Sequence, residues 1–141
     1  MVQAEVRYPG TCPECGATGE WSGAQILPDG AQQLGWDAEF TCPTCGTGLA
    51  ACGGQPPEGA RELLLATGGA ATLLLAPDTK PPAAMRVLRA SLGLDLTSVR
   101  HVLEQIQHGE YVCTLPEAEL LARRMREAGL EAVAQQVGHG A

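Results

Sequence analysis

The chain contains few of the side chains from which small domains usually build a core. Trp, Tyr and Phe together make up only 4% of its 141 residues, although hydrophobic residues of all kinds reach 45%. A core must therefore come from Leu, Val, Ala and Ile. Glycine (18) and proline (10) are frequent and lie mostly in the first half of the chain. A short glycine-rich region with few aromatic residues generally needs a cross-link or a metal to stay folded.

Positive charge is also scarce in the N-terminal part. Residues 1–60 contain one base, Arg7, and seven acids, whereas residues 61–141 contain eight bases and nine acids. The whole chain has a formal net charge of −7. Binding of nucleic acid depends on Lys and Arg side chains that neutralise phosphates. The charge of the N-terminal part therefore argues against DNA or RNA as its ligand.

Long hydrophobic runs are missing as well. The longest, "LLLA" and "TLLLA", fall far short of the roughly 20 residues that a membrane-spanning helix needs. The first residues, "MVQAEVRYPG", lack the basic start and apolar run of a signal peptide. We therefore expect a soluble, cytoplasmic protein. In that compartment paired cysteines bind metals more often than they form disulfides.

Four of the six cysteines form two matching turns, "TCPECG" and "TCPTCG". These four are Cys12, Cys15, Cys42 and Cys45. Each Cys-x2-Cys turn can supply two of the four tetrahedral ligands of a structural Zn²⁺. We expect two strands, 19–27 and 34–40, joined at an Asp29-Gly30 turn, to bring both pairs to one ion. This arrangement resembles the zinc ribbon family and predicts a zinc site.

Other interpretations of the cysteines stay open at this point. Two disulfides are one, and redox thiols are another, although Cys-x2-Cys redox motifs usually begin a helix beside a strand. Cys52 could replace one of the four ligands, and Cys113 is expected to be a small buried hydrophobic residue. Four thiolates leave no open position on the metal for water or substrate. We therefore expect the zinc to stabilise the fold, and we expect the protein not to be an enzyme.

The rest of the chain is predicted to alternate strands and helices. Residues 54–69 are expected to form a linker or an extra hairpin strand, and the segment 61–67 could also be a short helical turn. From 70 to 138 the pattern predicts the order β-α-α-β-α-β, with strands at 70–76, 110–114 and 130–137. Together with a small β zinc ribbon at 1–53, this makes an α+β protein.

Helix boundaries have clear signals in this second unit. Gly93 is placed to stop the first helix, and Asp95 to cap the second. Thr114 and Glu117 have capping-box spacing, with Pro116 between them in the first turn of the last helix. The side chains expected to face the core are Met85, Leu88 and Leu92 in the first helix and Leu96, Val99, Leu103 and Ile106 in the second.

The segments "MRVLRASLGLDLTSVRHVLE" and "EAELLARRMREAGLEAVAQ" are similar to the C-terminal domain of the bacterial ribosomal large-subunit stalk protein, L seven/L twelve. The resemblance covers the predicted second unit. It implies a domain that recruits translational GTPases through a face made by its first two helices. The N-terminal helical hairpin of that family is replaced here by the predicted ribbon, so this chain should not be an ordinary stalk subunit.

The resemblance also implies which residues form the partner-binding face. They are Lys80, Arg86, Arg89, Gly93, Leu94, Leu96 and Arg100. The chain departs from the family pattern at three positions, because Asp95 stands in place of a second turn glycine and Thr97 and Pro81 in place of basic residues. A further basic cluster, Arg123, Arg124 and Arg126, is expected to be a solvated face screened by nearby glutamates.

These observations predict a two-module, zinc-stabilised adaptor that docks a protein partner, a translation factor or a ribosome-associated protein. Independently of the resemblance, three guanidinium groups near one helix junction can bind carboxylates in bidentate fashion. The alternative function is a zinc ribbon that binds nucleic acid. The sequence contains no nucleophile–base set, carboxylate pair or phosphate-binding loop that would favour an enzyme.

Overall fold

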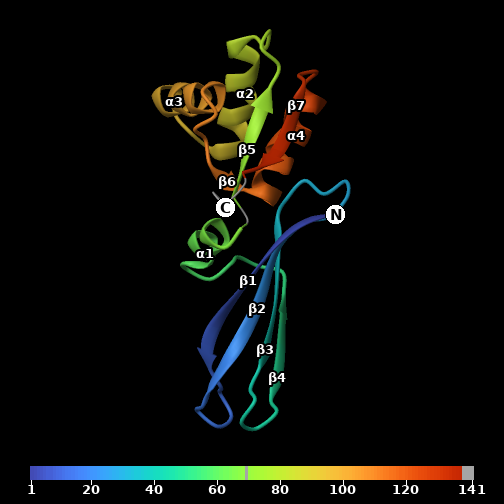
Figure 1. The fold of residues 1–141 in the computed structure, drawn as a ribbon. Helices are drawn as coiled ribbons and strands as arrows, with labels where there is room; N and C mark the ends of the chain where they lie inside the picture. Colours follow the sequence, from blue (N-terminus) through green and yellow to red (C-terminus); the bar gives the residue numbers. More distant parts are fainter. Residues whose placement is uncertain (69, 138–141) are drawn as a thin grey trace.

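The computed structural model describes residues 1–68 and 70–137 and contains two antiparallel sheets (Figure 1). The first sheet has four strands in the order β1-β2-β3-β4. The second has three strands in the order β6-β5-β7. The predicted α+β fold class, with a ribbon-like sheet followed by a β-α-α-β-α-β segment, is therefore confirmed. Residue 69 and residue 138, where the predicted second unit ends, lie outside the described residues.

The first sheet forms a long ribbon that carries the cysteine turns at the end away from the rest of the chain (Figure 1). Its strands are β1 (Val2–Thr11), β2 (Thr18–Leu27), β3 (Gly35–Thr41) and β4 (Gly48–Cys52). The two inner strands confirm the prediction. The outer strands β1 and β4 were not predicted, although Ala4, Val6 and Tyr8 alternate with polar residues in β1 as a half-buried strand requires.

Helix α1 (Ala60–Ala66) packs on this sheet at the end opposite the cysteine turns (Figure 1). Its Leu64 is fully buried and packs with Val6, Trp36 and Ala38. Of the interpretations left open for residues 61–67, the helical one is therefore the structure that forms. The short helix follows Gly59, whose φ of 85° is in the left-handed region that favours glycine.

The second sheet is covered on one face by three helices. Its strands are β5 (Ala70–Leu75), β6 (Cys113–Thr114) and β7 (Ala132–Gln136), and its helices are α2 (Pro81–Leu92), α3 (Leu96–Gln107) and α4 (Leu115–Glu127). The strand predicted at 110–114 is thus much shorter. Only Cys113 and Thr114 pair with β5, because the preceding turn ends at Gly109 and residues 110–112 lie outside the ladder.

The predicted helix boundaries are confirmed. Gly93 ends α2 with a φ of 65°, and the Asp95 carboxylate accepts a hydrogen bond from the Ser98 N–H at the start of α3. Thr114 and Glu117 form a complete capping box on α4. These caps fix where each helix begins and therefore how its apolar face meets the sheet.

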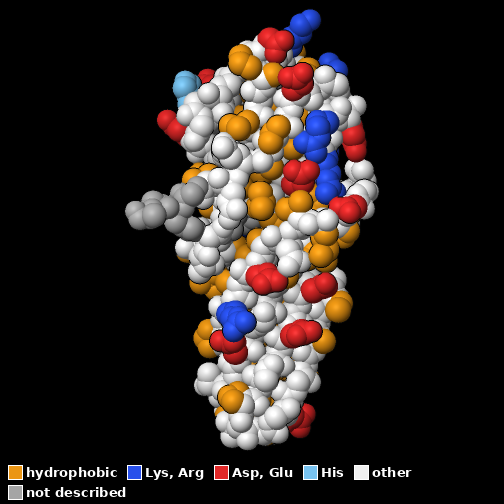
Figure 2. All heavy atoms as spheres, turned by 45° about the vertical axis from the view of Figure 1, so that its right-hand side comes forward, with side chains coloured by type: hydrophobic (Ala, Val, Ile, Leu, Met, Phe, Trp, Pro, Cys, Tyr) orange, Lys and Arg blue, Asp and Glu red, His pale blue; other side chains and the backbone are white. Residues whose placement is uncertain are grey.

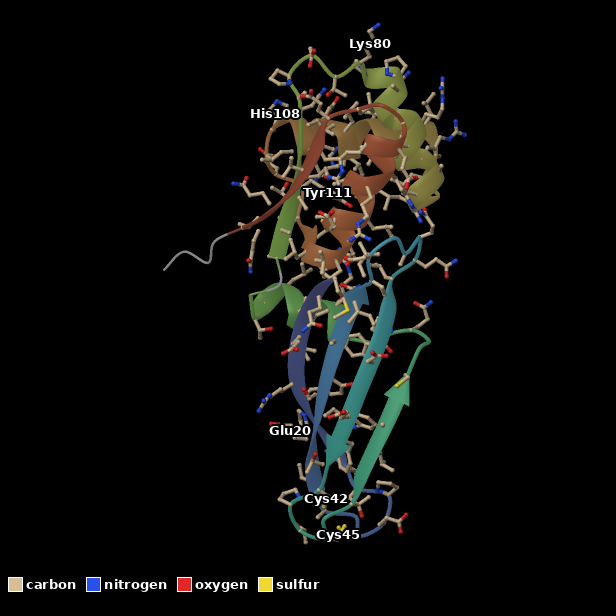
Figure 3. All side chains as sticks on the ribbon, turned by 90° about the vertical axis from the view of Figure 1, so that its right-hand side faces the viewer. Glu20, Cys42, Cys45, Lys80, His108 and Tyr111 are labelled. Atoms are coloured by element: carbon tan, nitrogen blue, oxygen red, sulfur yellow. The ribbon has the colours of Figure 1, made fainter. Side chains whose placement is uncertain are left out.

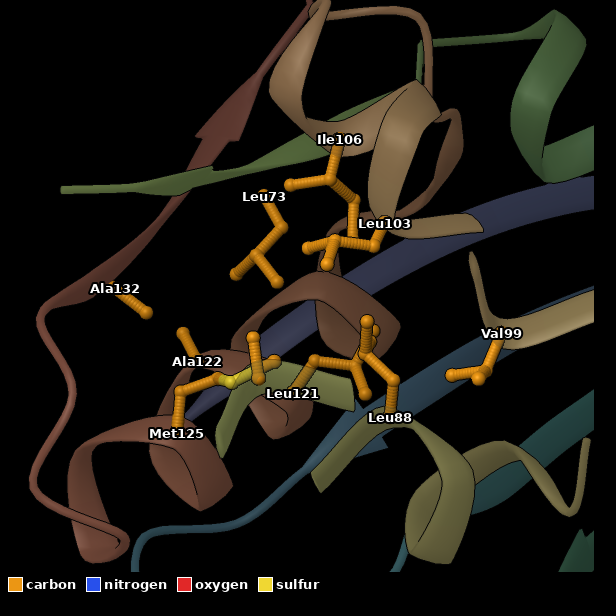
Figure 4. Close-up of a cluster of buried hydrophobic side chains, with 10 residues drawn as sticks. Leu73, Leu88, Val99, Leu103, Ile106, Leu121, Ala122, Met125 and Ala132 are labelled. Atoms are coloured by element: carbon orange, nitrogen blue, oxygen red, sulfur yellow. The ribbon is translucent and has the colours of Figure 1, made fainter. Parts of the chain in front are cut away.

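The core of the second unit is built from aliphatic side chains, as the composition predicts (Figure 4). Leu73 of β5, Leu88 of α2 and Met125 of α4 are fully buried in it. Two of the predicted core residues do not join them. Leu92 is 37% exposed and Leu96 is 47% exposed, and both lie beside the tight turn at Gly93 between α2 and α3.

Among the described residues, none of the helices combines the length and the apolar character needed to cross a membrane.

Candidate metal centre and arginine groove

Two hairpin turns of the same design hold the four thiols. In each turn the first cysteine donates its N–H across the hairpin, Cys12 to the Ala17 carbonyl at 2.8 Å and Cys42 to the Thr47 carbonyl at 2.9 Å. The glycine after each pair has a positive φ, 75° for Gly16 and 78° for its counterpart in the second turn. A side chain at either glycine would strain the turn, so the sequence Cys-x2-Cys-Gly fixes the position of the sulfur atoms.

The distances between the sulfur atoms fit one tetrahedral metal ion. Cys12 Sγ lies 3.7 Å from Cys45 Sγ, and Cys15 Sγ lies 3.6 Å from Cys42 Sγ. All four sulfur atoms lie within 4.8 Å of one another. Zn–S bonds of about 2.3 Å in a tetrahedron place sulfur atoms about 3.8 Å apart. The cluster, at the tip of the ribbon (Figure 3), can therefore hold a metal ion.

The two sides of the cluster differ in their surroundings. Cys12 and Cys42 are buried against Phe40, whereas Cys15 and Cys45 are exposed. The Thr47 hydroxyl lies 2.9 Å from Cys45 Sγ. Its hydrogen bond is the main cause that lowers the pKa of the Cys45 thiol to about 6. At Cys45 the protein therefore favours the thiolate form, which is the metal ligand, whereas the pKa of the Cys15 thiol is raised to about 12.

The other two cysteines lie outside this cluster. Cys52 is exposed on β4 and does not belong to the group of four. Cys113 is buried between Ala71 and Ala118, as a small hydrophobic residue would be. Burial raises the pKa of its thiol to about 12. Cys113 is therefore protonated and inert at neutral pH.

A groove of about 650 Å³ lies between helices α2 and α3. It is lined by Pro82, Met85, Arg86, Arg89, Ala90, Leu96, Val99 and Arg100. We call this surface the arginine groove. The structure thus brings together four of the residues that the sequence singled out, namely Arg86, Arg89, Leu96 and Arg100. Leu96 was expected both to face the core and to belong to the partner face; it is exposed and lines the groove.

The remaining predicted residues of the partner face lie beside the groove or beneath it. Gly93 forms the turn that lets α2 and α3 approach each other. Leu94 packs partly against the core, and Lys80 caps the start of α2 without lining the groove. Pro82 and Ala90, which the sequence did not indicate, line it because they lie on the same face of α2 as the arginines.

The charges of the groove arginines are not neutralised by close ion pairs within the described residues. In the described part of the chain, none of Arg86, Arg89 and Arg100 forms an ion pair within 4.0 Å. The charge of Arg89 acts on the carboxylate of Asp95. Its carboxyl has a lowered pKa, mainly because the Ser98 N–H donates to it, with a smaller contribution from the charge of Arg89. The groove therefore combines an apolar floor with unpaired positive charge at its rim.

The second arginine cluster has a structural role that the sequence did not indicate. Arg123 donates to the Pro28 carbonyl and Arg124 to the Gln32 carbonyl, each at 2.8 Å. Both contacts reach from α4 to the loop between β2 and β3. Glu119 does pair with Arg123 and Arg126, as expected of nearby glutamates. The interpretation of a merely solvated face is nevertheless wrong, because two of the arginines connect the ribbon to α4.

No protein-family model, no curated protein and no solved structure matches this chain. The resemblance to the ribosomal stalk domain therefore stays a prediction. The zinc-ribbon-like character of the first sheet depends on the geometry of its four-cysteine cluster alone.

Proposed function

We propose that this protein is a non-catalytic adaptor that docks an acidic segment of a protein partner in the arginine groove. The ribbon is a second module, held together by Zn²⁺ at its four cysteines. The single observation that carries the proposal is the groove itself, in which three unpaired arginines surround an apolar floor. A translational GTPase or a ribosome component is the partner class that the resemblance to the stalk domain implies.

The side chains that line the groove indicate which kind of partner segment would bind there. Met85, Ala90 and Leu96 offer apolar surface to one or two hydrophobic side chains of the partner. Arginines at the rim can bind carboxylates in bidentate fashion. An amphipathic helix with apolar anchors flanked by Asp or Glu satisfies both parts of the site. Rim charges of this kind mainly accelerate association and make it sensitive to salt.

The alternative function, a ribbon that binds nucleic acid, has less support. The ribbon surface drawn in Figure 2 shows several acidic side chains (red) and few basic ones (blue). Its one basic residue, Arg7, lies 3.5 Å from Glu20. A phosphate backbone would be repelled by such a surface. Charge therefore favours a partner that presents a basic segment to the ribbon or an acidic segment to the groove.

The proposal is tested with purified translational GTPases and the full-length, zinc-loaded chain. We expect the double variant Arg89→Glu/Arg100→Glu to weaken binding by at least about tenfold, without a change in melting temperature, because both side chains are exposed at the rim. Arg7→Glu, which reverses one charge on the ribbon, is the control for charge reversal outside the groove and should bind normally. Measurement is by fluorescence anisotropy at two salt concentrations.

A second pair of variants tests the apolar floor. Leu96→Ser removes an exposed leucine from the groove. Leu74→Ser is the control, because Leu74 on strand β5 is 42% exposed, similar to Leu96, and does not line the groove. Only the first should weaken binding. If neither the charge reversal nor Leu96→Ser alters the affinity, the arginine groove is not the docking site. A mobility shift with RNA or DNA that Arg7→Glu abolishes would instead support the nucleic-acid alternative.

A further inference from the structure

The outer strand of the ribbon, β4 (Gly48–Cys52), is a sheet edge with nothing on its far side (Figure 1). All five of its residues are exposed, and none of them is charged or proline. Unpaired strand edges attract other strands, and proteins usually block them with charges, proline, short length or a covering side chain. This edge has no such protection among the described residues.

The other three sheet edges of the molecule are protected. Strand β1 carries the exposed Glu5 and Arg7 and has Pro9 at an outward-facing backbone position. Strand β6 consists of two residues only. On β7 the Arg126 guanidinium donates to the Ala132 carbonyl at 2.8 Å. The contrast between these edges and β4 indicates that the bare edge is a binding surface.

The register of the hairpin shows which backbone groups of β4 are available. The Cys42 N–H donates to the Thr47 carbonyl, so alternate pairs along the ladder exchange hydrogen bonds, including Phe40 with Leu49 and Ala38 with Ala51. The N–H and C=O groups of the residues between them point away from β3. These residues are Gly48, Ala50 and Cys52.

We propose that β4 is a self-association edge, at which two copies of this chain pair their β4 strands antiparallel about a twofold axis at Ala50. In this register Ala50 faces its own copy and Gly48 faces Cys52, so every outward backbone group gains a partner. On the side of the sheet that carries Phe40, Leu49 falls opposite Ala51 of the other copy. The large and small side chains complement each other, and Leu49, 39% exposed in the single chain, becomes covered.

The charge of the chain limits where a second copy can approach. Each chain carries a net charge of −7, so two copies repel each other wherever charged surfaces meet. Strand β4 itself carries no charge, and the acidic Asp37 and Glu39 lie one strand further in, on β3. Salt should therefore strengthen the contact, whereas it would weaken an attraction between the arginine groove of one copy and the acidic ribbon of another.

Sedimentation equilibrium of the zinc-loaded full-length chain tests the proposal. A five-residue strand edge is a small interface, so we expect a weak dimer with a dissociation constant on the order of 0.1–1 mM that tightens as salt is raised. Ala50→Pro removes an outward N–H without removing a hydrogen bond to β3. Ala50→Lys places like charges opposite each other on the axis. Each should weaken dimerisation by at least about tenfold.

Matched controls separate edge pairing from other effects. Gln3→Lys adds the same charge to the protected β1 edge and should leave the dimer intact. In a dilution series followed by ¹⁵N NMR, the amide signals of Gly48, Ala50 and Cys52 should shift together. A chain that stays monomeric to about 1 mM at high salt overturns the proposal. So does a dimer that both Ala50 variants leave unchanged, or one that salt dissociates.

Discussion

The Thr114 hydroxyl donates a buried hydrogen bond to the side-chain carbonyl of Gln25, and this bond joins the two sheets of the molecule. Gln25 belongs to β2 of the ribbon and is 5% exposed, while Thr114 is fully buried at the start of α4. The same hydroxyl accepts from the Glu117 N–H. Arg61 of α1 in turn donates to both carboxylate oxygens of Glu117. One polar network thus connects the ribbon, α1 and α4.

Thr114→Val should destabilise the whole chain by about 2–4 kcal/mol, because it leaves the buried Gln25 amide without a partner and removes the cap of α4. Urea unfolding measures the loss. Thr114→Ser keeps the hydroxyl and is the control. The double variant Thr114→Val/Gln25→Leu should recover part of the stability, since neither side chain then leaves a buried polar group unsatisfied. Additive effects of the two single substitutions would show that the sheets are not coupled here.

The four-cysteine cluster should bind one zinc ion per chain, as measured by elemental analysis of the purified protein. Cys42→Ser should abolish binding and unfold the ribbon, because the metal contributes folding free energy that is on the order of 10 kcal/mol in small zinc modules. Cys52→Ser is the matched control, with one exposed thiol outside the cluster replaced. A loss of zinc in the control would mean that Cys52 is a ligand after all.

Thiol labelling gives an independent check on the same assignment. In the zinc-loaded protein Cys52 should react rapidly with a maleimide at neutral pH, and Cys113 should not, because it is buried. Chelation under denaturing conditions should expose all six cysteines.

The close packing of the ribbon predicts that Gly23→Ala destabilises the folded protein. A Cβ at Gly23 would collide with the Trp36 ring, which is buried and has no room to move. Overpacking of this kind should cost about 1–3 kcal/mol in the free energy of unfolding. At Gly48 the nearest atom to a Cβ is the Phe40 carbonyl oxygen at 3.9 Å, so Gly48→Ala should be well tolerated. Thermal melts of both variants with zinc bound compare the two positions.

Helix caps and tight turns could be predicted from the sequence, because each depends on residues that are close together in the chain. The caps at Asp95 and Thr114, the turn at Gly93 and the two cysteine turns all act within a few residues, so their residue types are sufficient to place them. The outer strands β1 and β4 were both missed, although β1 alternates buried Ala4 and Val6 with exposed polar residues. In β4 every residue is small or apolar and none is buried, so no pattern of period two exists.

The sequence by itself indicated the four cysteines of the candidate metal centre, the α+β class and the arginines beside the turn at Gly93, because each follows from spacing within a turn or along a helix. Only the tertiary structure decided that Arg123 and Arg124 bind the carbonyls of a loop about ninety residues away. It also decided which sheet edge is bare. Contacts between residues so distant in the chain depend on how whole elements pack, and no local residue pattern encodes them.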